Sequence, residues 1–246
     1  MSDFWSAFQF LTIIPLGRSS EFRPESTIPW FPVVGFCLGL FLALFNLLAL
    51  SFWPAQTVAV LDVLLLVCVT GALHLDGVAD AADGMLGTRP REKALEIMKD
   101  SRVGAMGLVA VVSVLAVKWA GMYAVLTGGA SWRTFLIFLL VPAFSRGSMN
   151  LGIRFLAYGR PSGGTGHDFF ESEPDFRMYL GVLLLMGLSL FLGFQGIWLI
   201  FCFALISALV LYYYKQRMDC ITGDMLGAMC ETSEALLFLA AGMSLG

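Results

Sequence analysis

The sequence predicts an all-α, polytopic membrane protein with about seven transmembrane helices and an N-terminal interfacial helix. Hydrophobic residues make up 58% of the 246 positions, and charged residues make up only 13%. A soluble domain carries about 25% charged residues, so lipid is the natural solvent for this chain. The apolar residues fall in separate runs, most of them close to the roughly 20 residues that a spanning helix needs. Residues 1–246 are therefore predicted to form one integral-membrane domain.

The helices can be placed in order along the chain. Apolar and aromatic side chains share one face of the segment Asp3–Ile14, which predicts a helix lying in the membrane interface. Gly35 and Gly39 form a G-x-x-x-G step in the first long run, a pattern typical of close helix packing. The spans predicted from the apolar runs are about 31–52, 58–75, 105–126, 134–150, 179–194, 197–214 and 225–244.

Lysine and arginine residues predict the orientation of these spans. With the N-terminus inside, the inner segments hold 12 of the 15 basic residues and the outer loops hold one, Arg133. The other two, Lys118 and Arg146, fall inside predicted spans. The long polar loops that then face the cytoplasm are about 76–104, 151–178 and 215–224. We therefore expect a multi-pass protein of the bacterial inner membrane with its site facing the cytoplasm.

Three aspartates follow the second predicted span. Asp76, Asp80 and Asp83 are spaced i, i+4 and i+7, which places them within about a 60° arc of one helix face. Like charges on one stripe repel, and a membrane boundary makes the repulsion worse. Carboxylate and phosphate oxygens are the ligands that Mg²⁺ prefers. We therefore predict a site for Mg²⁺, with Mn²⁺ as the alternative metal; the competing interpretation is a solvated acidic helix end.

Basic residues on the same side of the membrane predict phosphate contacts. Lys99 and Arg102 flank Asp100 immediately before the third span. Arginine binds phosphate oxygens bidentately, and lysine acts as a point charge. A basic anchor at the interface is the alternative for this pair. Arg146, near the inner end of the fourth span, is either a phosphate contact or a snorkelling anchor.

Two further polar segments lie toward the C-terminus. Arg160 stands in the glycine-rich segment Tyr158–His167, whose backbone could wrap a phosphate, although glycine-rich loops are also simply flexible. Asp224 and Glu231 are seven residues apart and share the face of a helix that enters the membrane, with Glu234 at the edge of that stripe. Acidic residues inside a membrane usually mark function.

These motifs resemble one known family, cobalamin synthase, the adenosylcobinamide-GDP ribazoletransferase. The resemblance covers nearly the whole chain. It is carried by H-L-D-G-x-A-D-x-x-D-G at 74–84, E-I-M-K-D-S-R-x-G at 96–104, S-R at 145–146 and T-G-D-x-L-G-A-x-x-E at 222–231. The chain departs from the family before Thr222, where Asp219-Cys220 stand in place of the usual glycine pair, so Asp219 is a poor catalytic candidate.

The resemblance implies a transferase of cobalamin biosynthesis whose substrates are adenosylcobinamide-GDP and α-ribazole or its 5′-phosphate. A ribose hydroxyl attacks the phosphorus bonded to the aminopropanol arm, GMP leaves, and adenosylcobalamin or its 5′-phosphate forms. The hydroxyl needs a base or a bound metal; Asp100 and Asp224 are candidate bases, and the sequence does not choose between them. Glu231 is expected to orient a bound group. The cations expected to cover phosphate charge are Lys99, Arg102, Arg146 and Arg160.

Two other functions fit part of the pattern. A lipid-producing CDP-alcohol phosphotransferase would share D-x-x-D-G at 80–84, but the Ala-Arg that follows in that pattern is absent here. A proton- or cation-coupled transporter would place charges near the midplane of several spans, whereas only Lys118 and Asp62 lie away from one face. A net charge of −3 gives no indication of nucleic-acid binding. The sequence leaves open whether the chain forms a homo-oligomer.

Overall fold

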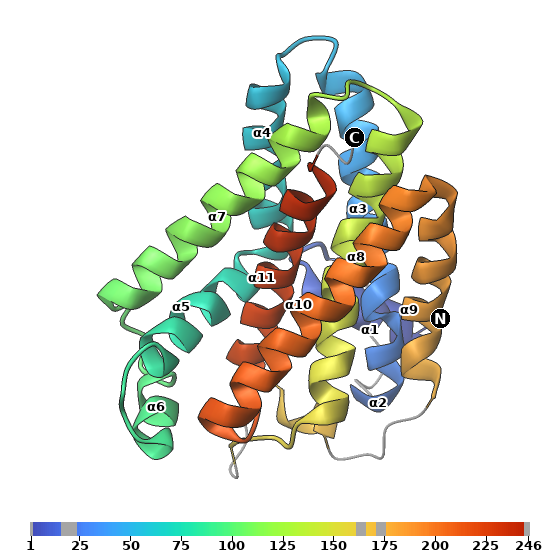
Figure 1. Ribbon diagram of the computed structural model, residues 1–246. Helices are drawn as coiled ribbons and strands as arrows, with labels where there is room; N and C mark the ends of the chain where they lie inside the picture. The colour runs from blue at the N-terminus through green and yellow to red at the C-terminus, as the bar shows by residue number, and fades with distance from the viewer. Residues whose placement is uncertain (1, 16–23, 161–165, 171–175, 244–246) are drawn as a thin grey trace.

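The computed structural model describes residues 2–15, 24–160, 166–170 and 176–243, and within them the regular structure is helical (Figure 1). The predicted all-α class is therefore confirmed. The N-terminal half contains α1 (Ser2–Leu11), α2 (Pro24–Thr27), η1 (Ile28–Trp30), α3 (Phe31–Ala49), α4 (Ala55–Thr70), α5 (Leu73–Met85), α6 (Arg91–Ile97) and α7 (Ala105–Leu126). The C-terminal half contains α8 (Trp132–Phe155), η2 (His167–Phe170), α9 (Arg177–Ser189), η3 (Leu190–Leu192), α10 (Phe194–Met218) and α11 (Gly223–Ala241).

Four helical segments are long and apolar enough to cross a membrane: Pro24–Ala49, α7, α8 and α10. α4 and α5 meet the same criterion only together, as a pair bent by 91°. Of the other two predicted spans, α9 is shorter and α11 carries three acidic residues. Four or five candidate spans are thus present among the described residues, and the count of seven stays a prediction.

α8 is the central helix of the bundle, since 89% of its apolar stretch is buried, against 22% for α7 and 28% for α10. α3 packs closely along it, as the G-x-x-x-G step predicted. A Cβ on Gly39 would lie 2.6 Å from the carbonyl oxygen of Phe138, and one on Gly35 would lie 2.7 Å from the Cα of Ala143. Only glycine allows this approach, so the two positions fix the α3–α8 contact.

A sharp corner separates α4 from α5. Gly71 and Ala72 both adopt left-handed backbone, with φ of +60° and +58°, and Ala72 N–H donates to the Val67 carbonyl at 3.0 Å. The predicted span 58–75 therefore ends at Thr70, because left-handed residues cannot continue an α-helix. The aspartate stripe consequently lies on a separate helix, α5, which packs against α11 and runs from there toward α6 (Figure 1).

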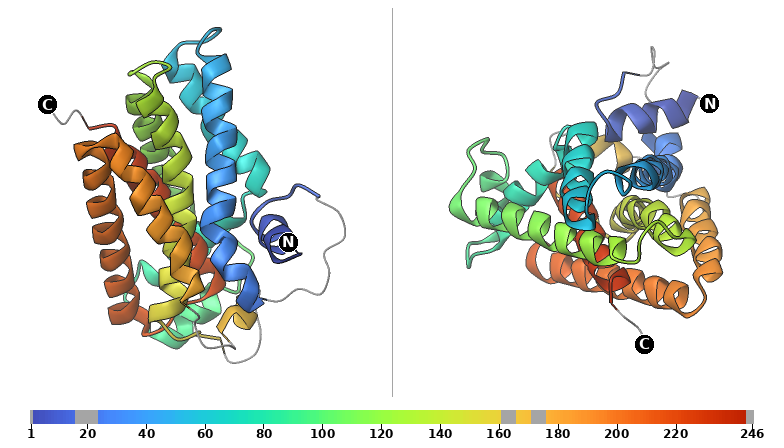
Figure 2. Two further views of the ribbon diagram at one scale, coloured as in Figure 1. Left: turned by 90° about the vertical axis from the view of Figure 1, so that its right-hand side faces the viewer. Right: turned by 90° about the horizontal axis from the view of Figure 1, so that it is seen from above.

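The predicted polar loops contain more helix than expected. α5 and α6 occupy much of 76–104, α8 continues to Phe155 and α10 continues to Met218. The predicted N-terminal helix is present as α1, which lies beside the lower part of α3 at the side of the bundle (Figure 2). Its place in a membrane interface stays a prediction. Arg18, Arg23 and residues 161–165 of the glycine-rich segment lie outside the described residues.

Candidate active site

The three predicted aspartates lie along α5. Asp76 is exposed, whereas Asp80 and Asp83 are half-buried. Because α5 begins only after the left-handed corner, the stripe starts near the first turn of a new helix and not at the end of the preceding one. This placement puts α5 in contact with α11 at the lower part of the bundle (Figure 1).

Two glycines bring α11 against this stripe. A Cβ on Gly77 would lie 2.6 Å from the carbonyl oxygen of Asp224, and one on Gly227 would lie 3.2 Å from the Cα of His74. Each glycine belongs to one of the two acidic motifs, so each motif supplies a residue at which α5 and α11 touch. The crossing places Asp224 close enough for its charge to act on Asp80.

Asp80 lies in a mainly negative environment. The charges that act on it come from three carboxylates and one guanidinium: Asp224, Asp76, Asp83 and Arg160. With Asp80 itself, four carboxylates face one cation, which gives a net formal charge of −3 when all are ionised. Repulsion of this size at a membrane boundary favours a bound cation. We name Asp76, Asp80, Asp224 and Arg160 the acidic site.

A short backbone bridge holds Arg160 in the acidic site. The Gly159 N–H donates to the carbonyl of Ile221 at 2.9 Å, and the Ile221 N–H donates to the carbonyl of Ala157 at 2.9 Å. The Arg160 guanidinium then donates to the Asp224 carboxylate at 2.5 Å and to the main-chain carbonyl of Met98 at 3.3 Å. Charge-assisted contacts of this kind fix both side chains. The structure thus brings together Asp224 and Arg160, which the sequence placed in separate loops.

Asp83 has a different set of partners. Its two carboxylate oxygens accept the main-chain N–H groups of Gly104, at 2.6 Å, and Gly107, at 2.9 Å. These donors lie at the N-terminus of α7, where unpaired N–H groups and the helix dipole favour a negative charge. A Cβ on Gly107 would also lie 2.9 Å from the carbonyl oxygen of Ala79, so glycine is required there. Asp83 therefore joins α5 to α7.

The motif at 99–102 lies at the surface. Arg102, 87% exposed, donates to both carboxylate oxygens of Asp100, with the shortest contact at 2.5 Å. These hydrogen bonds lower the pKa of Asp100 to about 2. A carboxylate with so low a pKa is a weak proton acceptor near neutral pH. Lys99 is exposed at the end of the same segment.

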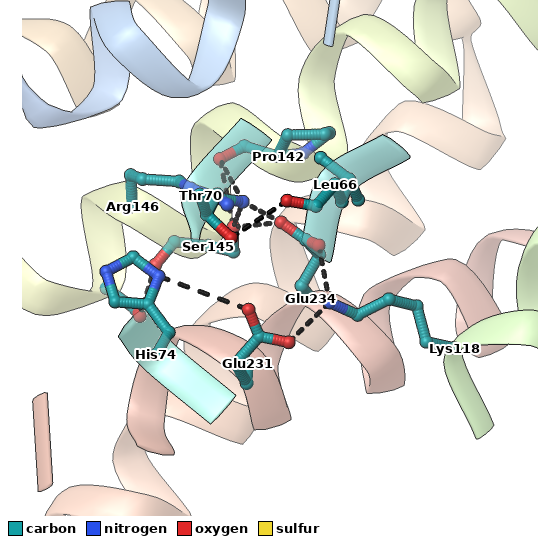
Figure 3. A network of polar contacts seen from close by, with 10 residues as sticks. Leu66, Thr70, His74, Lys118, Pro142, Ser145, Arg146, Glu231 and Glu234 are labelled. Atoms are coloured by element: carbon teal, nitrogen blue, oxygen red, sulfur yellow. Dashed lines mark hydrogen bonds and ion pairs between the residues drawn. The ribbon is translucent and has the colours of Figure 1, made fainter. Parts of the chain in front are cut away.

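A second group of charges lies inside the helix bundle, away from water. Lys118 of α7 donates to Glu231 at 2.5 Å and to Glu234 at 2.7 Å, both on α11 (Figure 3). All three side chains are at most 5% exposed. Removing such charges from water is costly unless they are paired, and here one ammonium group joins two carboxylates.

Arg146 and Ser145 of α8 complete this group. Arg146 forms an ion pair with Glu234, and the Ser145 hydroxyl donates to the same carboxylate at 2.9 Å. His74, at the start of α5, points its Nδ1 toward Glu231 at 4.0 Å (Figure 3). Two cations and two carboxylates therefore balance. We name Lys118, Arg146, Glu231 and Glu234 the buried charge network.

The network gives two predicted site residues, Arg146 and Glu231, buried ionic partners within the protein; the phosphate contact predicted for Arg146 and the orienting role predicted for Glu231 stay predictions. It also contains partners that the sequence did not assign. The available signals were the position of Lys118 inside its span and the spacing of Glu234 three residues after Glu231. Neither signal shows which helix faces which, so the pairing needed the structure.

The donor chemistry of the acidic site suits a hard cation, because its ligands are carboxylate oxygens. Among the described residues, however, no three acidic, histidine or cysteine side chains are arranged to hold a metal by themselves. Mg²⁺ commonly takes one or two carboxylates and completes its shell with water and substrate phosphates. The residues present fit that mode of binding.

The long apolar helices (Figure 1) and the acidic site indicate the class of multi-pass membrane proteins with an acidic site. The sequence comparisons narrow this class. A family model described as cobalamin-5-phosphate synthase matches residues 3–242, and the chain belongs to that family.

Curated relatives agree with this assignment. An adenosylcobinamide-GDP ribazoletransferase of Geotalea daltonii is 36% identical over 96% of this chain and 95% of its own length. Proteins of the same name from Syntrophobacter fumaroxidans and Brevibacillus brevis are 37% and 34% identical, with at least 97% of each chain covered. No solved structure matches the chain.

Proposed function

We propose that this enzyme transfers the phosphocobinamide group of adenosylcobinamide-GDP to α-ribazole or its 5′-phosphate, and that the acidic site carries the reaction. Its family membership makes it a transferase of cobalamin biosynthesis, and its relatives bear the name of this activity. A ribose hydroxyl oxygen bonds to the phosphorus next to the aminopropanol arm. The bond from that phosphorus to GMP breaks, and adenosylcobalamin or its 5′-phosphate forms.

The single observation that supports the site is its unbalanced charge. Four carboxylates act on one another with only Arg160 as a cation among the charges that act on Asp80. A diphosphate adds further negative charge, so binding of the substrate there favours a bound metal ion. Asp76 and Asp80 would hold Mg²⁺, with Mn²⁺ as the alternative, and Asp83 would contribute its charge while it holds α7. A metal held there would supply positive charge to offset the diphosphate and the departing GMP.

The basic side chains would bind different parts of the substrate's negative charge. Arg160 lies in the acidic site and can move from Asp224 to a phosphate oxygen, a bidentate contact that suits its planar group. Lys99 and Arg102 are exposed beside the site in sequence and would meet the more distant phosphate or the nucleotide. Displacement at a diphosphate depends mainly on such positioning and neutralisation of charge.

Asp224 is the better candidate for the base that accepts the hydroxyl proton. It lies in the acidic site, whereas Asp100 is held by Arg102 at the surface. Release of Asp224 from Arg160 on phosphate binding would leave one carboxylate oxygen available for the proton. Glu231 would act indirectly, through His74 at the start of α5.

The orientation and the span count belong to the same proposal. We propose one domain with seven spans and its acidic site on the cytoplasmic side, because the excess of lysine and arginine falls there. A reporter fused after Arg102 or Arg217 should be active only in the cytoplasm, and one near Ser131 only in the periplasm. A periplasmic signal after Arg102 would overturn the proposed orientation.

The decisive experiment measures GMP release by the purified protein in detergent, with adenosylcobinamide-GDP as the donor. GMP and adenosylcobalamin should form in equal amounts when α-ribazole and Mg²⁺ are present, and neither should form after chelation of the metal. A CDP-alcohol donor should give no product. A transporter would bind or exchange substrate without forming GMP, so that result would overturn the enzyme assignment.

A further inference from the structure

A cavity of about 1160 Å³ lies at the lower end of the bundle, apart from the buried charge network. Its walls come from the 24–33 segment, the C-terminal end of α8, η2 and the first turns of α9, with α1 contributing one residue. These elements lie close together in the ribbon diagram (Figure 1). Binding sites for small ligands commonly measure about 300–1,000 Å³, so the cavity has room for a molecule of nucleoside size.

Aromatic rings form part of the lining. Tyr158 lies between His167, with ring centroids 5.5 Å apart, and Phe170, with ring centroids 5.1 Å apart, and Trp30 contributes a further ring. Aromatic side chains in offset or edge-to-face arrangements are the usual partners of a flat heterocycle. The lining therefore suits a planar aromatic group.

Charged side chains also line the cavity. Asp3 and Glu25 carry negative charge, and Arg154 and Arg177 carry positive charge. Hydroxyl groups of a sugar can hydrogen-bond to both kinds of side chain, and a phosphate can bind the arginines. The four charged side chains favour an occupant that carries polar groups beside its apolar part.

The cavity is linked to the acidic site through the backbone. Ala157 and Tyr158 line the cavity, and they also form the bridge to Ile221 that positions Arg160. Arg160 is two residues beyond Tyr158 and contacts Asp224. A molecule bound against Tyr158 would therefore present its adjoining part toward the site where the phosphate is attacked.

We infer that this cavity binds the acceptor nucleoside, with its aromatic base against Tyr158 and Phe170 and its ribose directed toward Arg160 and Asp224. The inference rests on the proposed function, since it assigns the acceptor of that reaction to a place in the fold. The donor diphosphate then occupies the acidic site, and the two substrates meet at the bridge formed by 157–160 and Ile221.

The test adds side-chain bulk to the cavity and keeps the main-chain carbonyl of Ala157, which accepts from the Ile221 N–H. Ala157 is exposed and lines the cavity, so Ala157→Leu adds bulk there. We expect it to raise the KM for α-ribazole about tenfold or more, with little change in the KM for adenosylcobinamide-GDP. Ala208→Leu, an exposed position on α10 away from the cavity, is the matched control and should leave both constants unchanged. An equal rise for both substrates, or a rise for the donor alone, would overturn the inference.

A binding measurement separates this inference from the proposed function. Equilibrium dialysis of α-ribazole against the purified protein needs no turnover. Wild type and Asp80→Asn should bind it equally, and Ala157→Leu should bind it about tenfold more weakly or worse. If wild type releases no GMP but still shows this binding pattern, the proposed function fails, while the assignment of the cavity as the α-ribazole binding site is retained. If Ala157→Leu loses a co-purified lipid and retains α-ribazole affinity, the cavity holds lipid and the inference fails.

Discussion

The acidic site and the buried charge network contain similar charged side chains, but they differ in charge balance and in exposure. The network sets two cations against two carboxylates, all at most 5% exposed, and every charge has an ionic partner. The acidic site sets four carboxylates, counting Asp83, against one guanidinium, and Asp76 is exposed. Buried charges must be matched when the protein folds, whereas accessible charges can be matched later by a ligand.

This difference separates stability from activity. A loss of balance in the network should cost folding free energy, because no water can reach the charge that is left. A loss of charge in the acidic site should instead reduce repulsion within the folded protein and weaken only what binds there. Substitutions in the two regions should therefore affect different measurements.

The largest effect on rate is expected at the acidic site. Asp80→Asn keeps the size of the side chain and removes its charge, so kcat should fall about a thousandfold at saturating Mg²⁺. Asp76→Asn should act in the same direction. Thermal unfolding in detergent should show wild-type stability or better, because one repulsive charge is gone. Glu92→Gln, an exposed position on α6, is the control and should retain full activity. Retention of more than about a tenth of the activity by both aspartate variants would contradict the metal assignment.

The largest effect on stability is expected in the buried charge network. Lys118→Met leaves two carboxylates facing Arg146 alone, and an uncompensated buried charge costs about 3–5 kcal/mol. Thermal unfolding in detergent should show this loss, while the folded fraction retains far more activity than Asp80→Asn. The double variant Lys118→Met with Glu234→Gln restores charge balance and should recover part of the loss. If the double variant is as unstable as the sum of its single variants, charge balance is not what the network provides.

Substitution of Asp83 should lower both the stability and the rate, each by a smaller amount. Asp83→Asn leaves one oxygen to accept from Gly104 or Gly107 and turns an amide N–H₂ group toward the other donor. A lost helix cap costs about 1 kcal/mol, and the missing charge at the α7 N-terminus adds to it. We expect a modest fall in unfolding temperature and a smaller fall in kcat than Asp80→Asn produces. If Asp83→Asn and Asp80→Asn lose kcat equally, Asp83 binds the metal as directly as Asp80 does.

The smallest effect should come from Asp100. Hydrogen bonds from Arg102 lower its pKa to about 2, so Asp100 stays ionised throughout the neutral and mildly acidic range. Any stability that it contributes is present above its unfolded pKa and is lost only as the pH falls toward about 2. Asp100→Asn should therefore leave the acidic limb of the pH–rate profile unchanged, whereas Asp224→Asn should remove it. Loss of the limb in Asp100→Asn would reverse the proposed choice of base.

The sequence predicted the elements that depend on local pattern. The apolar runs predicted the long helices to within a few residues at most ends, and the i, i+4, i+7 spacing put three aspartates on one helix. The G-x-x-x-G step predicted close packing of α3, although not that its partner is α8. The corner at Gly71 and Ala72 was not predictable, because alanine seldom adopts left-handed backbone and apolar residues continue on both sides.

The sequence also could not predict which polar side chains would contact one another. Lys118 meets Glu231 across 113 positions, and Asp83 meets Gly104 across 21. Such contacts depend on which helix faces meet, and periodicity within one helix does not contain that information. The acidic motifs at 74–84 and 222–231 pointed to the correct helices, while their meeting at Gly77 and Gly227 required the fold.

The wide separation of the network partners along the chain also bears on how the protein is made. Lys118 and Arg146 are synthesised on α7 and α8, and both of their carboxylate partners are on α11, the last helix of the described chain. Two cations therefore enter the membrane before their counterions exist, an arrangement that lipid disfavours. We therefore expect the earlier helices to reach their final packing only after α11 arrives. Completion of the bundle is thus tied to completion of the chain.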